Sequence, residues 1–350
     1  NHAGLMTKIQ MDSFKSKFGI TEGNEWNSFL DAKEDLELNE FIKNSPFQKA
    51  RHRKYNSKKV PVDDIILITE TKISTQNAFG KILDQYAKND TEFGNRIITT
   101  SPDVSVSTNL GPWINKKGLF SRTDSSDTFR DRKIPSAQKW IFSSQGQHIE
   151  LGIAEMNLFL MLGAAGLSHE LFGERLFPIG TVYDPFIARG LDAMNYACYQ
   201  DARFMIVGTP SGVSLAPEGG AHQSIGTPLI GISQPGLLSF EPAFADELSI
   251  IMNYGFNYLQ DENGGSVYLR LTTRSIEQPL REINHELKQN VIKGGYWLRK
   301  PGPNPEIIII YQGVVASEAV EATALLGERF KDIGVLAITS SDNLFHDWKN

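Results

Sequence analysis

The sequence predicts an α/β protein whose mostly parallel sheet is covered by helices on both faces. From about residue 70 onward, short β-branched strands alternate with helical stretches, which is the order of a parallel sheet with crossover helices. The chain has 350 residues, of which 40% are hydrophobic. That length and composition are those of a globular protein with about two domains, each large enough for a core.

Hydrophobic periodicity and turn residues divide the chain into elements. Helices are expected at 74–88, 153–166, 186–199, about 242–260 and 316–330. Strands are expected at 96–100, 203–208, 266–271, 306–311 and 334–339. Long loops are expected at 101–138, which is rich in Gly, Ser and Asp, and at 209–227; the Pro/Gly-rich stretch 300–305 is typical of an interdomain linker.

Charge and cysteine content exclude several classes of protein. A net charge of −6 argues against nucleic acid or an anionic membrane as the main partner. No secretory signal is present, and the apolar run 158–167 is too short to span a bilayer. A single cysteine excludes an internal disulfide and fits a reducing compartment, so we expect a cytoplasmic protein. Cys198, which has no histidine beside it, is expected in the core.

Standard nucleotide-binding loops and nucleophile elbows are absent, and the seven histidines lack zinc-ligand spacing, so no metal site is expected in this chain. The remaining candidates are polar residues on loops after strands, where open α/β sheets bind ligands. The chain begins without methionine and stops just after a predicted strand. We therefore expect an internal piece of a longer protein.

Glu155 is the only formal charge in the apolar helix 153–166. A helix that is apolar all round is normally buried. An uncompensated carboxylate there costs several kcal/mol, so Glu155 should be protonated, paired or on a cavity. Alternatively, the acid favours the amino end of its own helix, where a carboxylate is stabilised. Position alone does not choose between these two interpretations.

Two further stretches carry candidate ligand-binding groups. Phe186 and Arg189 are three residues apart at the start of a helix, although a core phenylalanine and a surface salt bridge explain them as well. In the loop 216–223, two glycines allow close backbone approach to a ligand, and His222 is a natural proton shuttle. A lone loop histidine is more often only solvent-exposed.

Together the three stretches resemble the pyrimidine-binding domain of the transketolase superfamily of thiamine-diphosphate enzymes. Gly152-Ile-Ala-Glu155 is similar to the family's Gly-Ile-x-Glu signature, Tyr183-x-x-Phe186-x-x-Arg189-x-x-Asp192 to its next helix, and Glu218-Gly-Gly-Ala-His222-Gln223 to its acidic-glycine-histidine-glutamine loop. The likeness is greatest to the homodimeric decarboxylase component of 2-oxo acid dehydrogenases such as pyruvate dehydrogenase. It implies a thiamine-diphosphate-binding fold.

The resemblance also implies a division of the chain and extends to both of its ends. Residues 1–65 would be the end of a preceding domain and a linker, 66–299 the pyrimidine-binding domain, and 300–350 the start of a truncated transketolase C-terminal-like domain. The segment from Asn1 through Met11-Asp12 resembles that family's active-site loop region, and Val335 through Trp348 resembles the opening of its last domain.

Roles for individual residues follow from the resemblance. Glu155 would hydrogen-bond the aminopyrimidine ring of the cofactor and activate it, and Phe186 would stack on that ring. His222 would lie over the reacting carbon as a catalytic and substrate-binding group, and Arg189 would meet a substrate carboxylate or phosphate. The remaining matches are Tyr183 and Asp103 as cofactor-binding residues and His2 as a substrate-binding residue.

The family's segment for the diphosphate and Mg²⁺ is missing from this chain, so the resemblance implies a homodimer whose sites are shared between subunits. A family histidine is replaced by Gly4, and a second by Ser224-Ile-Gly-Thr227. The implied reaction is decarboxylation of a small 2-oxo acid, pyruvate or 2-oxobutyrate, with acyl transfer to a lipoyl-bearing acyltransferase. The alternatives are ketol transfer between sugar phosphates, or a non-catalytic binding or regulatory protein.

Overall fold

The computed structural model describes residues 4–27, 35–45, 57–123, 131–135 and 140–349, in two units that comprise residues 1–54 and 55–350. The first unit contains α1 (Lys8–Lys17) and α2 (Leu36–Asn44), and neither helix has a buried residue. The Thr7 side chain accepts from the backbone of Gln10, whose side chain accepts from the Thr7 backbone, which fixes the start of α1. These are short helices without a buried face.

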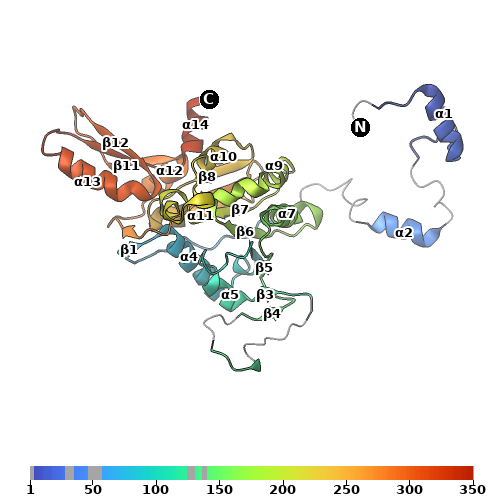
Figure 1. Cartoon of the computed structure of the whole chain (residues 1–350), viewed down its shortest axis with the longest axis horizontal. Helices are drawn as coiled ribbons and strands as arrows, with labels where there is room; N and C mark the ends of the chain where they lie inside the picture. Colours follow the sequence, from blue (N-terminus) through green and yellow to red (C-terminus); the bar gives the residue numbers. More distant parts are fainter. Residues whose placement is uncertain (1–3, 28–34, 46–56, 124–130, 136–139, 350) are drawn as a thin grey trace. The chain divides into compact units, whose positions relative to one another are not determined.

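The second unit is built on an eight-stranded sheet with the order β4-β3-β5-β2-β6-β7-β9-β8 (Figure 1). Every pairing between these described strands is parallel. The strands are β2 (Ile97–Ser101), β3 (Leu119–Phe120), β4 (Phe142–Ser143), β5 (His148–Glu150), β6 (Phe177–Val182), β7 (Met205–Gly208), β8 (Leu237–Phe240) and β9 (Ser266–Arg270). The parallel sheet that the sequence predicts is therefore confirmed.

The strand residues alternate between two separate cores, one on each face of the sheet. Met205 and Val207 pack into the larger core with α4 (Thr75–Asn89), α5 (Gly111–Lys117) and α11 (Ala245–Tyr258). Phe204 and Ile206 point the other way, into a core with α7 (Glu155–Gly166) and α9 (Leu191–Tyr199). Successive side chains of a strand face opposite sides, so both faces need apolar residues and both are covered by helices.

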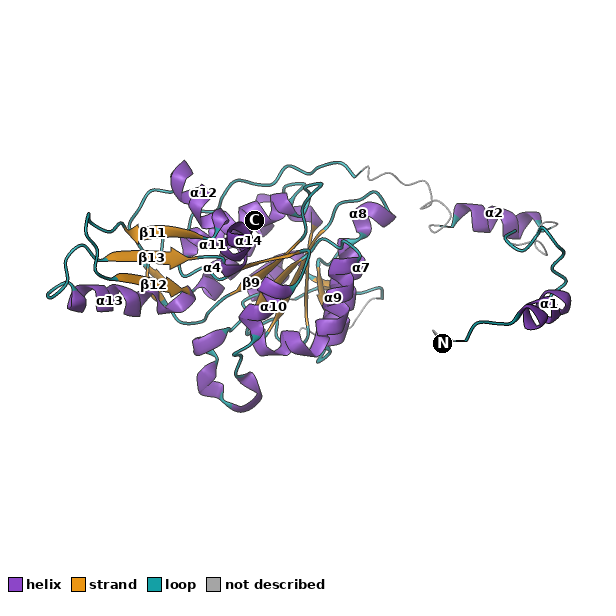
Figure 2. Cartoon of the chain, turned by 90° about the horizontal axis from the view of Figure 1, so that it is seen from above, coloured by secondary structure: helices purple, strands orange, loops and turns teal. Residues whose placement is uncertain are grey.

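A smaller three-stranded sheet has the order β11-β13-β12 and lies along α13 (Figure 2). Its strands are β11 (Gly295–Arg299), β12 (Ile308–Gln312) and β13 (Gly334–Ile338), and α13 spans Ala316–Leu326. β12 and β13 are parallel, as their predicted βαβ order requires, while β11 is antiparallel to β13. β11 lies before the predicted linker at 300–305; the division of the chain at residue 300 stays a prediction.

Several elements differ from the sequence-based prediction. The expected loop 101–138 contains α5 and β3, the helix expected from 186 begins as the 3-10 turn η3 (Asp184–Gly190), and the loop 209–227 contains three such turns, η4 (Gly212–Ser214), η5 (Ala216–Glu218) and η6 (Gly220–His222). Elements that the prediction did not contain are β1 (Lys72–Ile73), η2 (Gly94–Arg96), α8 (Ser168–Leu171), α10 (Thr227–Ser233), β10 (Ile276–Glu277), α12 (His285–Lys293), η7 (Gly313–Val315) and α14 (Ser341–Lys349), together with β4, β5, β8 and β11. Most are too short to show a period in sequence.

The helix α7 is not buried all round, contrary to its composition. Leu158, Phe159 and Leu162 lie in the core, but Ile153, just before the helix, is 78% exposed and Leu160 is 58% exposed. The prediction of a fully buried helix is therefore wrong for this chain by itself. An apolar face without a cover is the physical feature that the sequence pattern detected.

We predict that Gly190→Ala destabilises the second unit by about 1–3 kcal/mol, the usual cost of overpacking. A Cβ at Gly190 would lie 2.2 Å from Cδ2 of Phe159 and 2.9 Å from the backbone oxygen of Glu155, so η3 and α7 would have to separate. The free energy of unfolding in urea measures the effect. Gly111→Ala is the control, because a Cβ there meets nothing within 4 Å. Equal stability of the two variants would contradict this packing.

Candidate functional site

The candidate residues lie after four neighbouring strands, β5, β2, β6 and β7, at their carboxyl ends. Asp103 follows β2, Glu155 follows β5, and His222 follows β7. Tyr183, Phe186 and Arg189 follow β6. Because the carboxyl ends of parallel strands meet at one edge, residues that are far apart in sequence share one region of the surface.

Glu155 is the first residue of α7 and is paired with Arg189. Glu155 is only 8% exposed, and Nη1 of Arg189 donates to Oε1 of Glu155 at 3.0 Å. The Arg189 side chain is half exposed. Of the expected states of Glu155, the structure shows the paired one. The carboxylate also lies in the first turn of the helix, so the helix-end interpretation applies at the same time.

The Arg189 guanidinium also lies over the ring of Phe186, 3.9 Å from its centroid. One planar group thus contacts an aromatic face and donates to a carboxylate. This combination suits arginine, whose flat fork both stacks and hydrogen-bonds. Phe186 itself is half-buried, so its ring is only partly used by the core.

Tyr183 and His222 complete a group of rings around Phe186. The His222 ring centroid is 5.3 Å from that of Phe186 and 6.1 Å from that of Tyr183. Nε2 of His222 lies 3.8 Å from a carboxylate oxygen of Glu218 on the same loop. The structure therefore brings together the Glu155, Phe186 and His222 stretches that the sequence analysis singled out separately.

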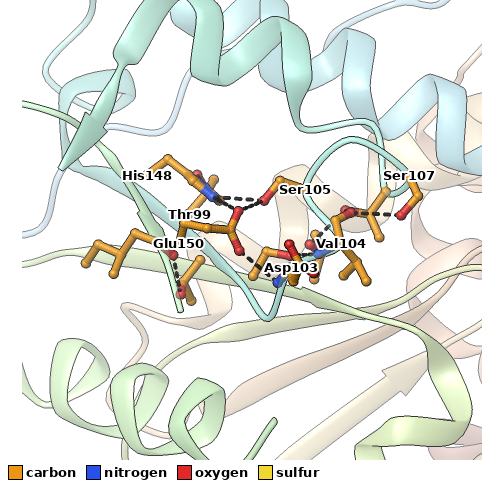
Figure 3. A network of polar contacts seen from close by, with 12 residues as sticks. Thr99, Asp103, Val104, Ser105, Ser107, His148 and Glu150 are labelled. Carbon is orange, nitrogen blue, oxygen red and sulfur yellow. Dashed lines mark hydrogen bonds and ion pairs between the residues drawn. The ribbon is translucent and has the colours of Figure 1, made fainter. Parts of the chain in front are cut away.

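Asp103 is exposed and has a left-handed φ of 66°, in a turn that Glu150 holds (Figure 3). The Asp103 backbone N–H donates to Oε1 of Glu150 at 2.8 Å, and the Ser105 hydroxyl donates to Oε2 at 2.5 Å. The turn is joined to the ring group, because the Tyr183 hydroxyl donates to Oγ of Ser107 at 3.0 Å.

Glu150 and the buried His148 form a polar network that sequence reasoning did not identify (Figure 3). Nε2 of His148 lies 3.0 Å from Oγ of Ser105 and 3.4 Å from Oε2 of Glu150. Burial raises the pKa of the Glu150 carboxyl, but hydrogen bonds from His148, Ser105 and the Asp103 backbone outweigh it, and the net effect lowers that pKa. The one signal in the sequence was that His148 and Glu150 are two residues apart on a strand, so that both side chains point to the same face of the sheet.

Two predicted positions are less informative. His2 lies outside the described residues, and Gly4 in the first unit is exposed.

Among the residues that the structure describes, no group of three His, Cys, Asp or Glu side chains is placed to hold a metal ion. Cys198 is buried, and burial raises the pKa of its thiol to about 12. Within the same residues, no helix is long and apolar enough to cross a membrane.

The fold defines a transketolase-like α/β protein, and the candidate residues gather at the carboxyl edge of its sheet. Residues 68–279 match the family model described as pyruvate dehydrogenase E1 component middle domain. Since this match covers more than half of the chain, the chain belongs to that family.

Curated relatives of this chain are pyruvate dehydrogenase E1 components. That of Mycolicibacterium smegmatis is 27% identical over 263 residues, which cover 73% of this chain and 27% of the relative. That of Escherichia coli strain K12 is 25% identical over 286 residues, which cover 79% of this chain and 31% of the relative. The chain therefore spans less than a third of the length of these relatives.

Solved structures with the same fold are transketolases. The transketolase from Leishmania mexicana has a TM-score of 0.63 at 16% identity, over 97% of this chain and 43% of that chain. A split-gene transketolase, described as an inactive beta4 tetramer, has a TM-score of 0.50 at 21% identity, over 77% of this chain and 71% of that chain. At these identities the likeness shows the fold alone.

We predict that Glu150→Gln lowers the free energy of unfolding by about 1.5–3 kcal/mol at pH 7, the range for a hydrogen bond to a charged group. The folded-state pKa of Glu150 lies below its ordinary value of 4.5, so its stabilising effect is present above that pH and is lost as pH falls through the folded pKa. The difference between wild type and variant should therefore shrink below about pH 4.5.

Urea titrations at several pH values test this prediction. Glu262→Gln, at an exposed position in the turn before β9, is the control and should change the free energy of unfolding by less than about 0.5 kcal/mol. A Glu150→Gln difference that stays constant down to pH 3 would show that the carboxylate does not hold the Asp103 turn through its charge.

Proposed function

We propose that this chain is the pyrimidine-binding part of a thiamine-diphosphate-dependent enzyme that decarboxylates a small 2-oxo acid, pyruvate or 2-oxobutyrate. The observation that carries the proposal is Glu155, a nearly buried carboxylate at the start of α7 beside the half-buried ring of Phe186. Membership of the pyruvate dehydrogenase E1 family supports it, because that family and the transketolases depend on this cofactor.

The residues present fit the aminopyrimidine end of the cofactor. The Arg189 guanidinium stacks on Phe186 and donates to Glu155 at 3.0 Å, so these two residues accept a flat group with hydrogen-bond donors. An aminopyrimidine is such a group. Among the described residues, no group of three His, Cys, Asp or Glu side chains is placed to hold a metal ion. We propose that another part of the protein or a second copy supplies the residues for the diphosphate and Mg²⁺.

The cofactor supplies a carbon nucleophile and an electron sink for decarboxylation when it is bound. Glu155 would orient the aminopyrimidine and share a proton with its ring nitrogen, and Phe186 would hold the ring by stacking. His222 would exchange a proton with the substrate through Nε2, and the exposed Asp103 carboxylate would contribute negative charge at the far end of the site. Tyr183 would help to position His222 through contact with its ring, and the Asp103 turn through a hydrogen bond to Ser107.

Arg189 would change partners during the reaction. Its half-exposed side chain is long enough to leave Glu155, whereas the carboxylate is fixed at the start of α7. After Arg189 leaves Glu155, its guanidinium would bind the carboxylate of the 2-oxo acid through two parallel hydrogen bonds, in a bidentate geometry. This role would assign Arg189 to the substrate.

We also propose that a second copy covers the exposed face of α7. Besides Ile153 and Leu160, the neighbouring helix α9 exposes Tyr196 and Tyr199. An apolar face of this kind marks an interface, and it adjoins Glu155. A homodimer joined there would complete each site with the partner's diphosphate-binding part. The split-gene transketolase chain, of which 71% aligns with this one, forms an inactive tetramer, which agrees with a pyrimidine part that needs its complement.

Acyl transfer to a lipoyl-bearing acyltransferase would complete the reaction. We propose that it takes place in the cytoplasm, because a single free and buried cysteine suits a reducing compartment. Ketol transfer between sugar phosphates and a non-catalytic role are outcomes of the assay below.

We expect Glu155→Gln to lower the oxidative decarboxylation of pyruvate and 2-oxobutyrate at least a hundredfold, because proton transfer by a positioned side chain contributes about 10²–10⁴. The assay uses the complete gene product that contains this chain, with thiamine diphosphate, Mg²⁺ and an artificial electron acceptor, beside ketose-phosphate transfer. Glu174→Gln is the control, because Glu174 pairs with Arg96 at 2.8 Å before β6, at the opposite edge of the sheet.

The outcomes separate the three functions. Oxo-acid turnover that collapses only in Glu155→Gln supports the proposal, and a raised KM in Arg189→Gln with unchanged cofactor affinity supports the substrate role of Arg189. Ketol transfer alone would assign the protein to the transketolases. Absence of both turnover and cofactor binding in the wild type would leave a non-catalytic protein.

We predict that Leu160→Glu converts the dimer into monomers and weakens association at least a hundredfold, because a buried unpaired charge costs several kcal/mol. Sedimentation velocity over a range of concentrations measures this. Leu325→Glu is the control, since Leu325 on α13 is 73% exposed and Leu160 is 58% exposed. A Leu160→Glu variant that sediments like the wild type would contradict an interface on α7.

A further inference from the structure

Asp184 is a fully buried carboxylate between two residues of the site, and none of the roles above uses it. It is the first residue of η3, directly after Tyr183 and two residues before Phe186. Its sequence context gives no signal of this position, since an Asp before Pro is common in turns. A buried carboxylate is tolerated only where charge and hydrogen bonds compensate it.

The charge is compensated by Arg270, the last residue of β9. Nε of Arg270 donates to Oδ1 of Asp184 at 3.3 Å and Nη2 donates to Oδ2 at 3.2 Å. The Tyr268 hydroxyl from the same strand donates to Oδ1 as well. Burial lowers the pKa of Arg270, but Asp184 and then Glu241 outweigh it, so the net effect raises that pKa and the guanidinium stays charged. Asp184 is therefore a fixed point at the end of the sheet.

Two further donors come from the segment that follows His222. The Ser224 hydroxyl donates to Oδ2 of Asp184 at 2.7 Å, and the Thr227 hydroxyl donates to the same oxygen at 2.5 Å. Ser224 is two residues after His222, and Thr227 begins α10. One carboxylate thus joins the element that carries Phe186 to the loop that carries His222.

This joint matters because the loop 209–227 contains only 3-10 turns of three residues each among its described elements. Such turns fix a side chain less firmly than a helix or strand does. The ring contact between Phe186 and His222, at 5.3 Å between centroids, needs a stronger tether close by. Two hydroxyl bonds to a fully buried carboxyl group provide one.

We propose that Asp184 is a positioning residue, which holds His222 against Phe186 by accepting hydrogen bonds from Ser224 and Thr227. It contacts neither of these site residues with its own carboxylate, and acts through the loop. The catalytic consequence rests on the function proposed above, whereas the structural consequence for the loop does not.

The experiment compares single-atom changes on the loop side of the joint, which leave the buried Asp184–Arg270 pair intact. Ser224→Ala and Thr227→Val each remove one donor, and Ser224→Thr keeps the hydroxyl. Ser214→Ala is the matched control, because the Ser214 hydroxyl lies in the same loop but donates to the backbone of Ser211 at 2.8 Å. Asp184→Asn is compared with Asp246→Asn, which neutralises the acid of another arginine–aspartate pair, at Arg281.

Hydrogen exchange of residues 219–226 and steady-state kinetics of the complete gene product are the two readouts. We expect exchange to rise severalfold in Ser224→Ala and Thr227→Val, and kcat to fall about ten- to a hundredfold with KM and cofactor affinity little changed. Ser224→Thr should restore both values, and Ser214→Ala should resemble the wild type. Asp184→Asn should exceed the single-donor variants in exchange, while Asp246→Asn should leave the loop unchanged.

Each outcome has one meaning. Unchanged exchange in both donor variants overturns the joint, whatever the activity. Increased exchange with an undiminished kcat overturns the positioning role, although the bonds exist. Increased exchange in a protein whose wild type turns over no oxo acid supports the joint and overturns the proposed function instead.

Discussion

Compensation of carboxylates at the carboxyl edge of the sheet is the constraint on which the site depends. Parallel strands deliver Glu150, Glu155 and Asp184 to one edge, where Glu155 and Asp184 are buried and the Glu150 side chain is 29% exposed. Each acid takes partners from other segments of the chain. Glu150 takes them from the turn after β2, Asp184 from β9 and the His222 loop, and Glu155 from Arg189. These bonds determine how the loops sit over the sheet, and so they place the site as well as stabilise the fold.

Asp184 and Glu155 differ in the partners that compensate their carboxyl groups, and this difference decides which of the two can exchange its partner. Asp184 is enclosed by a buried arginine and by hydroxyl groups on short side chains, so releasing it would leave a buried charge, at a cost of about 3–5 kcal/mol. Glu155 is nearly buried, but its partner guanidinium is half exposed, so Arg189 can move into solvent without itself becoming a buried charge. Under the proposed function, a ligand that stacks on Phe186 and donates to Glu155 would replace Arg189 without leaving the carboxylate unpaired. The exchangeable pair would then stand beside the bound ring, and the Asp184 pair would hold the elements around it.

The sequence predicts the site better where a residue contradicts its surroundings than where it agrees with them. Glu155 was found because it is the only charge in an apolar helix, and Phe186 and His222 because they lie at matching distances along a family pattern. Glu150 is an ordinary polar position at the end of a strand, and Asp184 an ordinary turn residue before proline. Their importance comes from partners far away in sequence, Ser105 and Arg270, and no local pattern records such a distance. β8 and β11 were not predicted for a similar reason. Short strands are fixed by pairing with strands that are distant in sequence, here β9 and β13, and not by a local pattern.

The prediction of a buried α7 failed in a way that bears on function. Its composition describes a helix with apolar neighbours on every side, yet the chain covers only the side of Leu158 and Leu162. An exposed apolar face marks an interaction surface, and the second copy proposed above would cover it. That copy would lie beside Glu155, at the amino end of α7. Under the proposed function, one partner that brings the diphosphate-binding part to this place would cover the apolar face and complete the cofactor site.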